Sequence, residues 1–214
     1  MKIYVVGNSK NKFLPLDGIR EKFLIDQKHE GDNIDNLNPW YCELTGLYYL
    51  WKHCDDDIVG LEHYRRYFWN GSHLLDETTI RNTLNDHDII CIRNGYSLRR
   101  PPRTWLEQHG KWHEMQKFLA FLKVYVGKDF YDACVRHLNG DWHALGNMFI
   151  AKKEVMNEYC EFIFDVLFKY VEAEQHYNRR LPGRILGYFT EFLFGAWILF
   201  TKKRYSFHGL KMIR

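Results

Sequence analysis

The sequence predicts a single α/β domain with a mostly parallel central sheet. Its 214 residues are enough to bury one sizeable core. Short apolar segments of strand length alternate along the chain with longer segments whose apolar residues recur at helical spacing. Polar residues able to do chemistry follow the strand segments. Open α/β sheets bind their ligands beyond such strand ends, so we expect a ligand site there.

The composition excludes several classes of protein. With 46% hydrophobic and 27% charged residues, and only 5 Pro and 15 Gly, the chain is neither disordered nor collagen-like. A formal net charge of +3 is too small for a polycationic nucleic-acid binder. Five scattered cysteines without a C-x-x-C pair suggest neither a disulfide scaffold nor a structural zinc site, and they favour a reducing cytoplasm.

No segment resembles an export signal or a membrane span. The first residues lack the charged region, long apolar run and cleavage site of a secretory signal. The most apolar stretch, residues 185–200, is shorter than the roughly 18 to 20 residues that a spanning helix needs, and Glu191 lies in its middle. We therefore expect a buried or interfacial helix in a cytoplasmic protein.

The first quarter of the chain predicts one strand and one helix. Residues 3–6 are β-branched and aromatic and lead into Gly7, which is typical of a buried first strand followed by a loop. Residues 10–38 are polar and rich in breakers, so we expect a loop with short elements. A helix over 41–53 should follow, with Asn38 as its N-cap and Pro39 at its first position.

The rest of the chain alternates strands and helices. Short β-branched runs predict the strands, and longer amphipathic runs predict the helices. We expect strands at 58–61, 88–92 and 147–150, helices at 76–85, within 104–138, at 153–170 and from 185, and exposed loops at 93–103 and 174–183.

The second predicted strand is followed directly by EHYRRYF (62–68), the segment of the sequence richest in side chains that can take part in chemistry. Arginine grips phosphate groups through two parallel hydrogen bonds, so Arg65 and Arg66 suit a diphosphate or the charge on a departing one. If the strand continues, His63 and Arg65 share one face while Tyr64 and Arg66 share the other. The alternative is a structural cluster of ion pairs that includes Glu62.

Metal-binding patterns are weak. The aspartates at 55–57 invite comparison with a D-x-D metal motif, but they precede a strand instead of following it, which favours a solvated turn. His109 and His113 have the spacing of metal ligands but lack the glutamate of HExxH, so a chance pair is favoured. Dinucleotide, Walker and G-x-S-x-G motifs are absent. No cofactor is certain from the sequence; Mg²⁺ or Mn²⁺ would have to bind without a well-placed D-x-D.

Glu191 is the one acid inside the apolar helix that starts at 185. Burial raises the pKa of a carboxyl and makes it a useful base. A structural pair with Arg184 is the equally favoured alternative. Asp141 and His143, just before the strand at 147–150, are weaker candidates for a functional role.

Four blocks carry a resemblance to a known family: GDNIDNLNPWYCELTGLYYLWKH (31–53), VGLEHYRRYF (59–68), GNMFIAKKEVMNEYCEFIFDVL (146–167) and GYFTEFL (187–193). Together they resemble the galactofuranosyltransferase domain family of bacterial capsule, exopolysaccharide and O-antigen clusters, long catalogued only as a domain of unknown function. The resemblance is collinear and covers nearly the whole chain. The sequence departs from the family at Tyr49-Leu50-Trp51, where a second Trp is frequent, and after Glu191, where an Arg is common.

This resemblance implies a single GT-A-like, Rossmann-type transferase domain over residues 1–201 and a basic tail over 202–214. It also implies an inverting transfer from a UDP-sugar, most characteristically UDP-galactofuranose. The acceptor would be a growing or polyprenyl-diphosphate-linked glycan of a surface polysaccharide.

Roles for individual residues follow as hypotheses. Glu191 would be the base that deprotonates the acceptor hydroxyl, and His63, Arg65 and Arg66 would stabilise the departing diphosphate, which would make a metal dispensable. The further candidates for binding the substrates are Gly7, Asn8, Asp32, Asn33, Tyr64, Asp141, Trp142 and Asn147.

The basic tail could bring such an enzyme to the inner face of the plasma membrane. Its cations, Lys202, Lys203, Arg204, Lys211 and Arg214, lie beside Tyr205 and Phe207 and suit an anionic lipid surface. A merely solubilising tail is the alternative.

Two rival functions compete with glycosyl transfer. A nucleic-acid module would rely on Arg93, Arg99, Arg100 and Arg103, but the low net charge and missing motifs argue against it, so no nucleic acid is expected as a partner. A catalytically silent sugar- or nucleotide-binding scaffold is the second rival.

Overall fold

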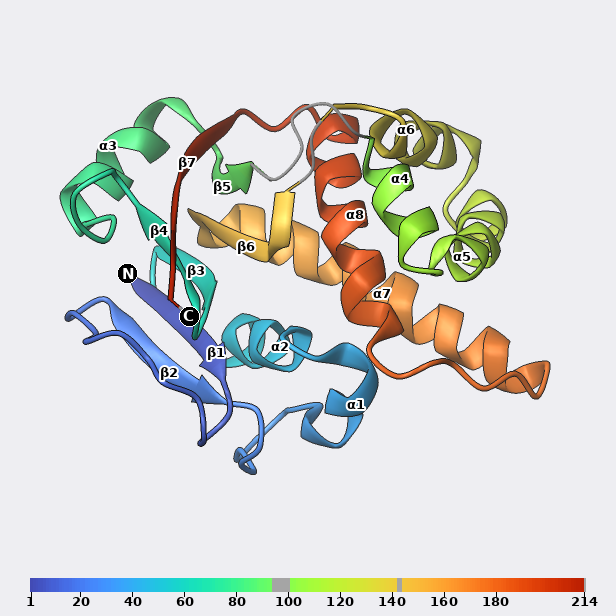
Figure 1. The fold of residues 1–214 in the computed structure, drawn as a ribbon, viewed down its shortest axis with the longest axis horizontal. Helices are drawn as coiled ribbons and strands as arrows, with labels where there is room; N and C mark the ends of the chain where they lie inside the picture. Colours follow the sequence, from blue (N-terminus) through green and yellow to red (C-terminus); the bar gives the residue numbers. More distant parts are fainter. Residues whose placement is uncertain (94–100, 142–143, 214) are drawn as a thin grey trace.

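The computed structural model describes residues 1–93, 101–141 and 144–213. It contains one sheet of seven strands with helices on both faces (Figure 1). The strands are β1 (Lys2–Gly7), β2 (Arg20–Leu24), β3 (Ile58–His63), β4 (Arg66–Trp69), β5 (Ile89–Arg93), β6 (Ala144–Lys152) and β7 (Tyr205–Met212). They pair in the order β2-β1-β3-β4-β7-β5-β6, and β3 also pairs with β6.

The sheet is mixed, so the prediction of a mostly parallel sheet is wrong. Parallel pairing joins β1 to β2 and β3, and β5 to β7. The other four pairings are antiparallel. Two features cause this: β4 turns back directly from β3, and β6 runs against both β3 and β5.

The helices confirm most of the predicted order. They are the 3₁₀ turn η1 (Asp35–Leu37), α1 (Asn38–Tyr41), α2 (Leu44–His53), α3 (Glu77–Asp86), α4 (Pro102–Gln108), α5 (Trp112–Tyr125), α6 (Lys128–Leu138), α7 (Lys153–His176) and α8 (Ile185–Phe200). Strands were also predicted correctly at β1, β3, β5 and β6, whereas β2, β4 and β7 were not expected.

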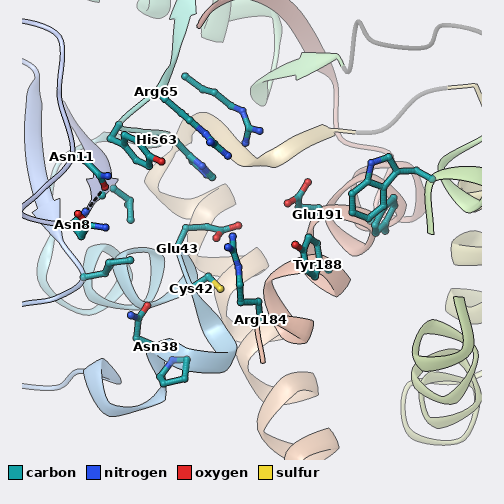
Figure 2. A pocket seen from close by; sticks show the side chains of 18 of the residues that line it. Asn8, Asn11, Asn38, Cys42, Glu43, His63, Arg65, Arg184, Tyr188 and Glu191 are labelled. Atoms are coloured by element: carbon teal, nitrogen blue, oxygen red, sulfur yellow. Dashed lines mark hydrogen bonds between the residues drawn. The ribbon is translucent and has the colours of Figure 1, made fainter. Parts of the chain in front are cut away.

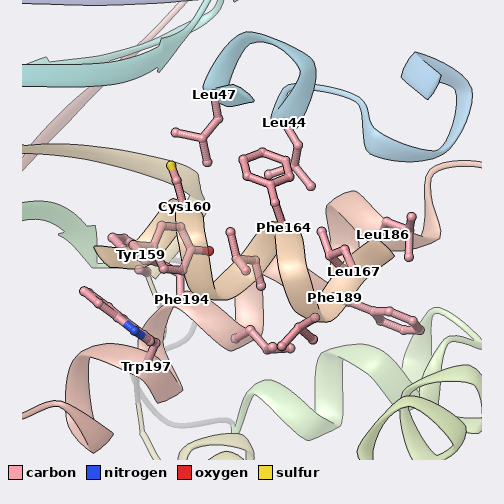
Figure 3. Close-up of a cluster of buried hydrophobic side chains, with 14 of the residues drawn as sticks. Leu44, Leu47, Tyr159, Cys160, Phe164, Leu167, Leu186, Phe189, Phe194 and Trp197 are labelled. Atoms are coloured by element: carbon pink, nitrogen blue, oxygen red, sulfur yellow. The ribbon is translucent and has the colours of Figure 1, made fainter. Parts of the chain in front are cut away.

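Two cores lie on the two faces of the sheet. In the larger core, α2, α7 and α8 pack against the sheet, and Leu44, Phe164 and Phe189 are among the buried side chains (Figure 3). The smaller core lies under α3 and includes Ile80 and Ile150. Helices α4, α5 and α6 lie on the side of α8 away from the strands (Figure 1).

Helix α8 is buried along most of its length, as predicted for residues 185–200. The reason is its position between the sheet and α6, where apolar residues are needed on all sides. Among the described helices, none combines the length and apolar character needed to cross a bilayer.

The predicted helix over 41–53 is broken in two. Cys42 has a φ of 53°, in the left-handed region, and this ends α1 before α2 begins at Leu44. Asn38 is the first residue of α1 and not its cap, because Leu37 holds the cap position without a side-chain hydrogen bond. Glu43 follows the break directly and occupies the N-cap position of α2.

Residues 202–214 do not form a separate tail, because β7 is part of the sheet. Its first half pairs with β5 and its second half with β4. Two of its neighbouring cations are already in ion pairs, Lys203 with Glu158 at 2.6 Å and Arg204 with Asp88 at 3.2 Å. Membrane docking by this segment stays a prediction.

Candidate active site

An open pocket of about 1050 Å³ lies beyond the carboxyl ends of β1 and β3 (Figure 2). Because these two strands are parallel, the residues that follow them meet at one edge of the sheet. The first contributes Gly7 and Asn8, and the second contributes residues 63–66. Across the pocket lie Glu43, at the junction of α1 and α2, and residues of α8 including Glu191.

The turn between β3 and β4 brings His63 and Arg66 together. Strand β3 ends at His63, and β4 begins at Arg66 after only Tyr64 and Arg65. His63 and Arg66 are directly paired, so their side chains lie on the same side of the sheet. The strand does not continue through residues 64 and 65, so the condition under which His63 and Arg66 would lie on opposite faces is not met. All four residues line the pocket.

Glu62 does form a buried ion pair, but its partner is Arg20 of β2. Arg20 donates from Nε and Nη2 to the two carboxylate oxygens at 2.8 and 3.1 Å, and the Phe68 N–H donates to Glu62 at 2.9 Å. Both side chains of the pair are inaccessible to solvent. Among the described residues, Arg65 and Arg66 have no carboxylate within ion-pair distance, and the buried Nε of Arg66 has no hydrogen-bond partner. The cluster around Glu62 thus leaves both arginines available to an anion.

A kink in β6 connects His63 to Glu191. Gly146 and Asn147 have φ values of 66° and 54°, and the strand bends at this point. Nε2 of His63 donates to the Gly146 carbonyl at 2.6 Å, and the Gly146 N–H donates to Oε2 of Glu191 at 3.2 Å. A side chain at position 146 would be strained and would lie 3.4 Å from a guanidinium nitrogen of Arg66.

The protonation states in the pocket suit acid–base chemistry. Burial lowers the pKa of His63, so the ring is neutral at pH 7, and its proton is on Nε2 because a carbonyl can only accept. Burial raises the pKa of Glu191 to about 7; the negative charge of Glu43 adds to the rise, while Arg66, the Gly146 N–H and Arg184 oppose it. Glu191 therefore exchanges a proton near neutral pH, as a general base must.

The sequence analysis did not consider Glu43. It considered Arg184 only as a partner of Glu191 and not as a residue of the pocket. Glu43 follows the left-handed Cys42, and Oε1 of Glu43 accepts from Nδ2 of Asn147 at 2.8 Å. Arg184 precedes α8 with a φ of 63°, and its N–H donates to the Pro39 carbonyl at 2.9 Å. Since both positions depend on a local break in the backbone, no sequence periodicity marks them.

Among the described residues, Arg184 and Glu191 form no ion pair at contact distance, although the charge of Arg184 lowers the pKa of Glu191. Cys42 also lines the pocket, and burial raises the pKa of its thiol to about 11. This thiol stays protonated at neutral pH and is a poor nucleophile.

The other predicted binding residues divide into three groups. Tyr64 and Asp141 line the pocket with Gly7 and Asn8. Asp32, Asn33 and Asn147 are not among the lining residues. Asp32 accepts from the Tyr48 hydroxyl, the Asn33 amide donates to backbone carbonyls of its own loop, and the Asn147 amide donates to Glu43. Trp142 falls outside the described residues, as do His143, a weaker functional candidate, and Arg99 and Arg100 of the nucleic-acid hypothesis.

The described residues bring together no group of three histidines, cysteines or acids that could hold a metal ion. The aspartate triplet makes ion pairs: Asp56 with the N-terminal ammonium and Asp57 with Arg81 at 2.6 Å. His109 stacks on Trp105, and its Nδ1 lies 2.8 Å from the Trp105 carbonyl.

Comparison with known proteins places this geometry in a wider context. The fold is similar to that of the apo structure of the bifunctional glycosyltransferase WbbM, with a TM-score of 0.77 at 20% sequence identity over 99% of this chain. The matched part is 45% of that protein, so the chain spans less than half of its length. No curated protein matches the chain. A family model described as "Domain of unknown function (DUF4422)" matches residues 3–203, and the chain therefore belongs to this family.

Proposed function

We propose that this protein is an inverting glycosyltransferase that moves a sugar, galactofuranose in our assignment, from a UDP-sugar to a glycan hydroxyl. The observation that carries the proposal is the pairing, in one pocket, of a carboxylate whose pKa is about 7 with three arginines, Arg65, Arg66 and Arg184. The similarity of fold to a glycosyltransferase supports it.

The arginines supply what a departing nucleoside diphosphate needs. As the glycosidic bond breaks, negative charge develops on the leaving oxygen, and fixed cations in a partly desolvated pocket stabilise that charge. Arg66 has a buried Nε without a partner among the described residues, so an incoming anion would satisfy this donor. A permanently charged guanidinium can serve here at any physiological pH.

Glu191 would take the proton from the acceptor hydroxyl. Inversion requires the acceptor to attack from the side opposite to the leaving group, so the acceptor and the nucleotide must occupy different ends of the pocket. Figure 2 shows Asn8 and Asn11 at one end of the pocket and Tyr188 and Glu191 at the other. We place the nucleotide at the β1 end and the acceptor against α8. A volume of about 1050 Å³ is at the upper limit for ligand pockets and leaves room for both.

The sequence resemblance supports the finer assignments. It favours UDP-galactofuranose as donor and a growing or polyprenyl-diphosphate-linked glycan as acceptor. These substrates belong to capsule, exopolysaccharide or O-antigen synthesis at the inner face of the plasma membrane.

The test is release of UDP by the purified protein with UDP-galactofuranose, UDP-galactopyranose and UDP-glucose in parallel, each with Mn²⁺ or EDTA and a lipid-linked glycan extract. We expect turnover with the furanose donor, undiminished by EDTA. Glu191→Gln should lower kcat by about 10²- to 10⁴-fold, the usual contribution of a general base. The exposed Glu161→Gln on α7 is the matched control and should leave the rate unchanged. Donor binding without turnover by the native protein would favour the silent scaffold instead.

A further inference from the structure

We propose that Glu43 is a positioning residue for Glu191. The kink in β6 holds the two carboxylates as a pair, and the negative charge of Glu43 offsets the charges of Arg66 and Arg184, which would otherwise make Glu191 a weaker base. This inference rests on the proposed function, and it names a residue that the sequence analysis did not consider.

Consecutive residues of the kink hold the two acids. The Gly146 N–H donates to Oε2 of Glu191 at 3.2 Å, and the next residue, Asn147, donates from Nδ2 to Oε1 of Glu43 at 2.8 Å. Asn147 is 1% exposed, so its amide is fixed by its surroundings. Asparagine is one of the few residues that adopt a left-handed φ at low cost, which explains its presence in the bend.

The same amide connects Glu43 to the helix that carries the base. Nδ2 of Asn147 also lies 3.3 Å from the carbonyl of Gly187, four residues before Glu191 on α8. An added Cβ at Gly187 would lie 3.4 Å from Cβ of Cys42 and 3.7 Å from Oε2 of Glu43. The helix therefore passes close to the segment of Glu43, and in Figure 2 both carboxylates point into the pocket.

The charges around Glu191 show why a second acid matters. The charged and titratable groups that line the pocket come from every neighbouring element: His63 of β3, Tyr64 and Arg65 of the turn, Arg66 of β4, Cys42 and Glu43 between α1 and α2, Asp141 before β6, and Arg184 and Tyr188 at the start of α8. Cations alone would favour the ionised form of Glu191 and make it a weaker base. The negative charge of Glu43 opposes them, and its effect is second only to that of burial.

The experiment is the pH dependence of kcat/KM in Glu43→Gln. The glutamine keeps the oxygen that accepts from Asn147 and removes only the charge. Without the charge of Glu43, Glu191 loses its proton at lower pH, so the acidic limb of the profile should move down by about one pH unit, with a lower plateau from the weaker base. Glu43→Asp retains a charge and should leave the limb near its native position. Glu161→Gln is the surface control.

A second readout does not depend on turnover. We would follow the side-chain carboxyl of Glu191 by ¹³C NMR through a pH titration, in the native protein and in Glu43→Gln. A lower midpoint in the variant supports the carboxylate pair, even if no donor is turned over and the proposed function fails. An unchanged midpoint in a folded, active Glu43→Gln protein overturns the inference while leaving the proposed function intact. If Glu43→Gln does not fold, the midpoint of the Glu191 titration is measured in Glu43→Ser instead.

Discussion

The buried pair of Arg20 and Glu62 supports the turn that presents the arginines, and removing either partner should be costly. Arg20→Met leaves the carboxylate of Glu62 in a solvent-free site with only the Phe68 N–H as donor. Breaking such a pair costs about 3–5 kcal/mol, and each kcal/mol lowers Tm by about 2–4 °C at this chain length. Glu62→Leu should cost less, because Arg20 keeps hydrogen bonds to Asp17 at 2.6 Å and to the Leu75 carbonyl at 3.1 Å.

A double-mutant cycle measures this interaction. Urea unfolding followed by circular dichroism gives the free energy of unfolding for each variant, and the double variant Arg20→Met/Glu62→Leu should recover much of the loss, since no unpaired charge remains. The exposed pair of Lys2 and Glu21 is the control; Lys2→Met should cost at most about 1 kcal/mol. The reasoning is refuted if both single variants lose the same small free energy of unfolding and the two losses add in the double variant.

Arg66→Ala should lower kcat/KM by about 10²- to 10³-fold in the UDP-release assay, as loss of a preorganised donor to a developing anion does. Arg103→Ala, an exposed change on α4, should not alter it, and equal rates for the two variants would contradict the leaving-group role. Gly195→Ala should destabilise the fold by about 1–3 kcal/mol, because a Cβ there would lie 2.3 Å from Cε1 of the buried His137. Thermal melts check this against Gly18→Ala, which meets nothing within 4 Å and should melt like the native protein.

The parts of the site that follow strand ends could be predicted from the sequence. Apolar runs at 3–6 and 58–61 identified the strands, and parallel pairing then required the residues after them, Asn8 and His63 among them, to share one edge. Glu191 could be identified because an acid inside an apolar helix is rare. In these cases a local pattern determines both burial and position.

The other features depend on contacts between distant segments. Nothing near Arg20 indicates that it is the partner of Glu62, because the pairing exists only once β2 lies beside β1. Glu43 faces the pocket because the backbone of Cys42 interrupts the helix, in a segment whose sequence pattern predicts one continuous helix. Strand direction is equally non-local, since the side chains of β6 alternate in the same way whether it runs with or against β3.

The position of β7 gives the chain an order of assembly during synthesis. The pairing of Tyr67 with Lys211 joins positions about 140 residues apart, so β4 and β5 leave the ribosome long before the strand that pairs with both. Until β7 arrives, each of them presents an open edge that could pair with another chain. The turn with the arginines therefore gains its full strand support only after β7 has been synthesised.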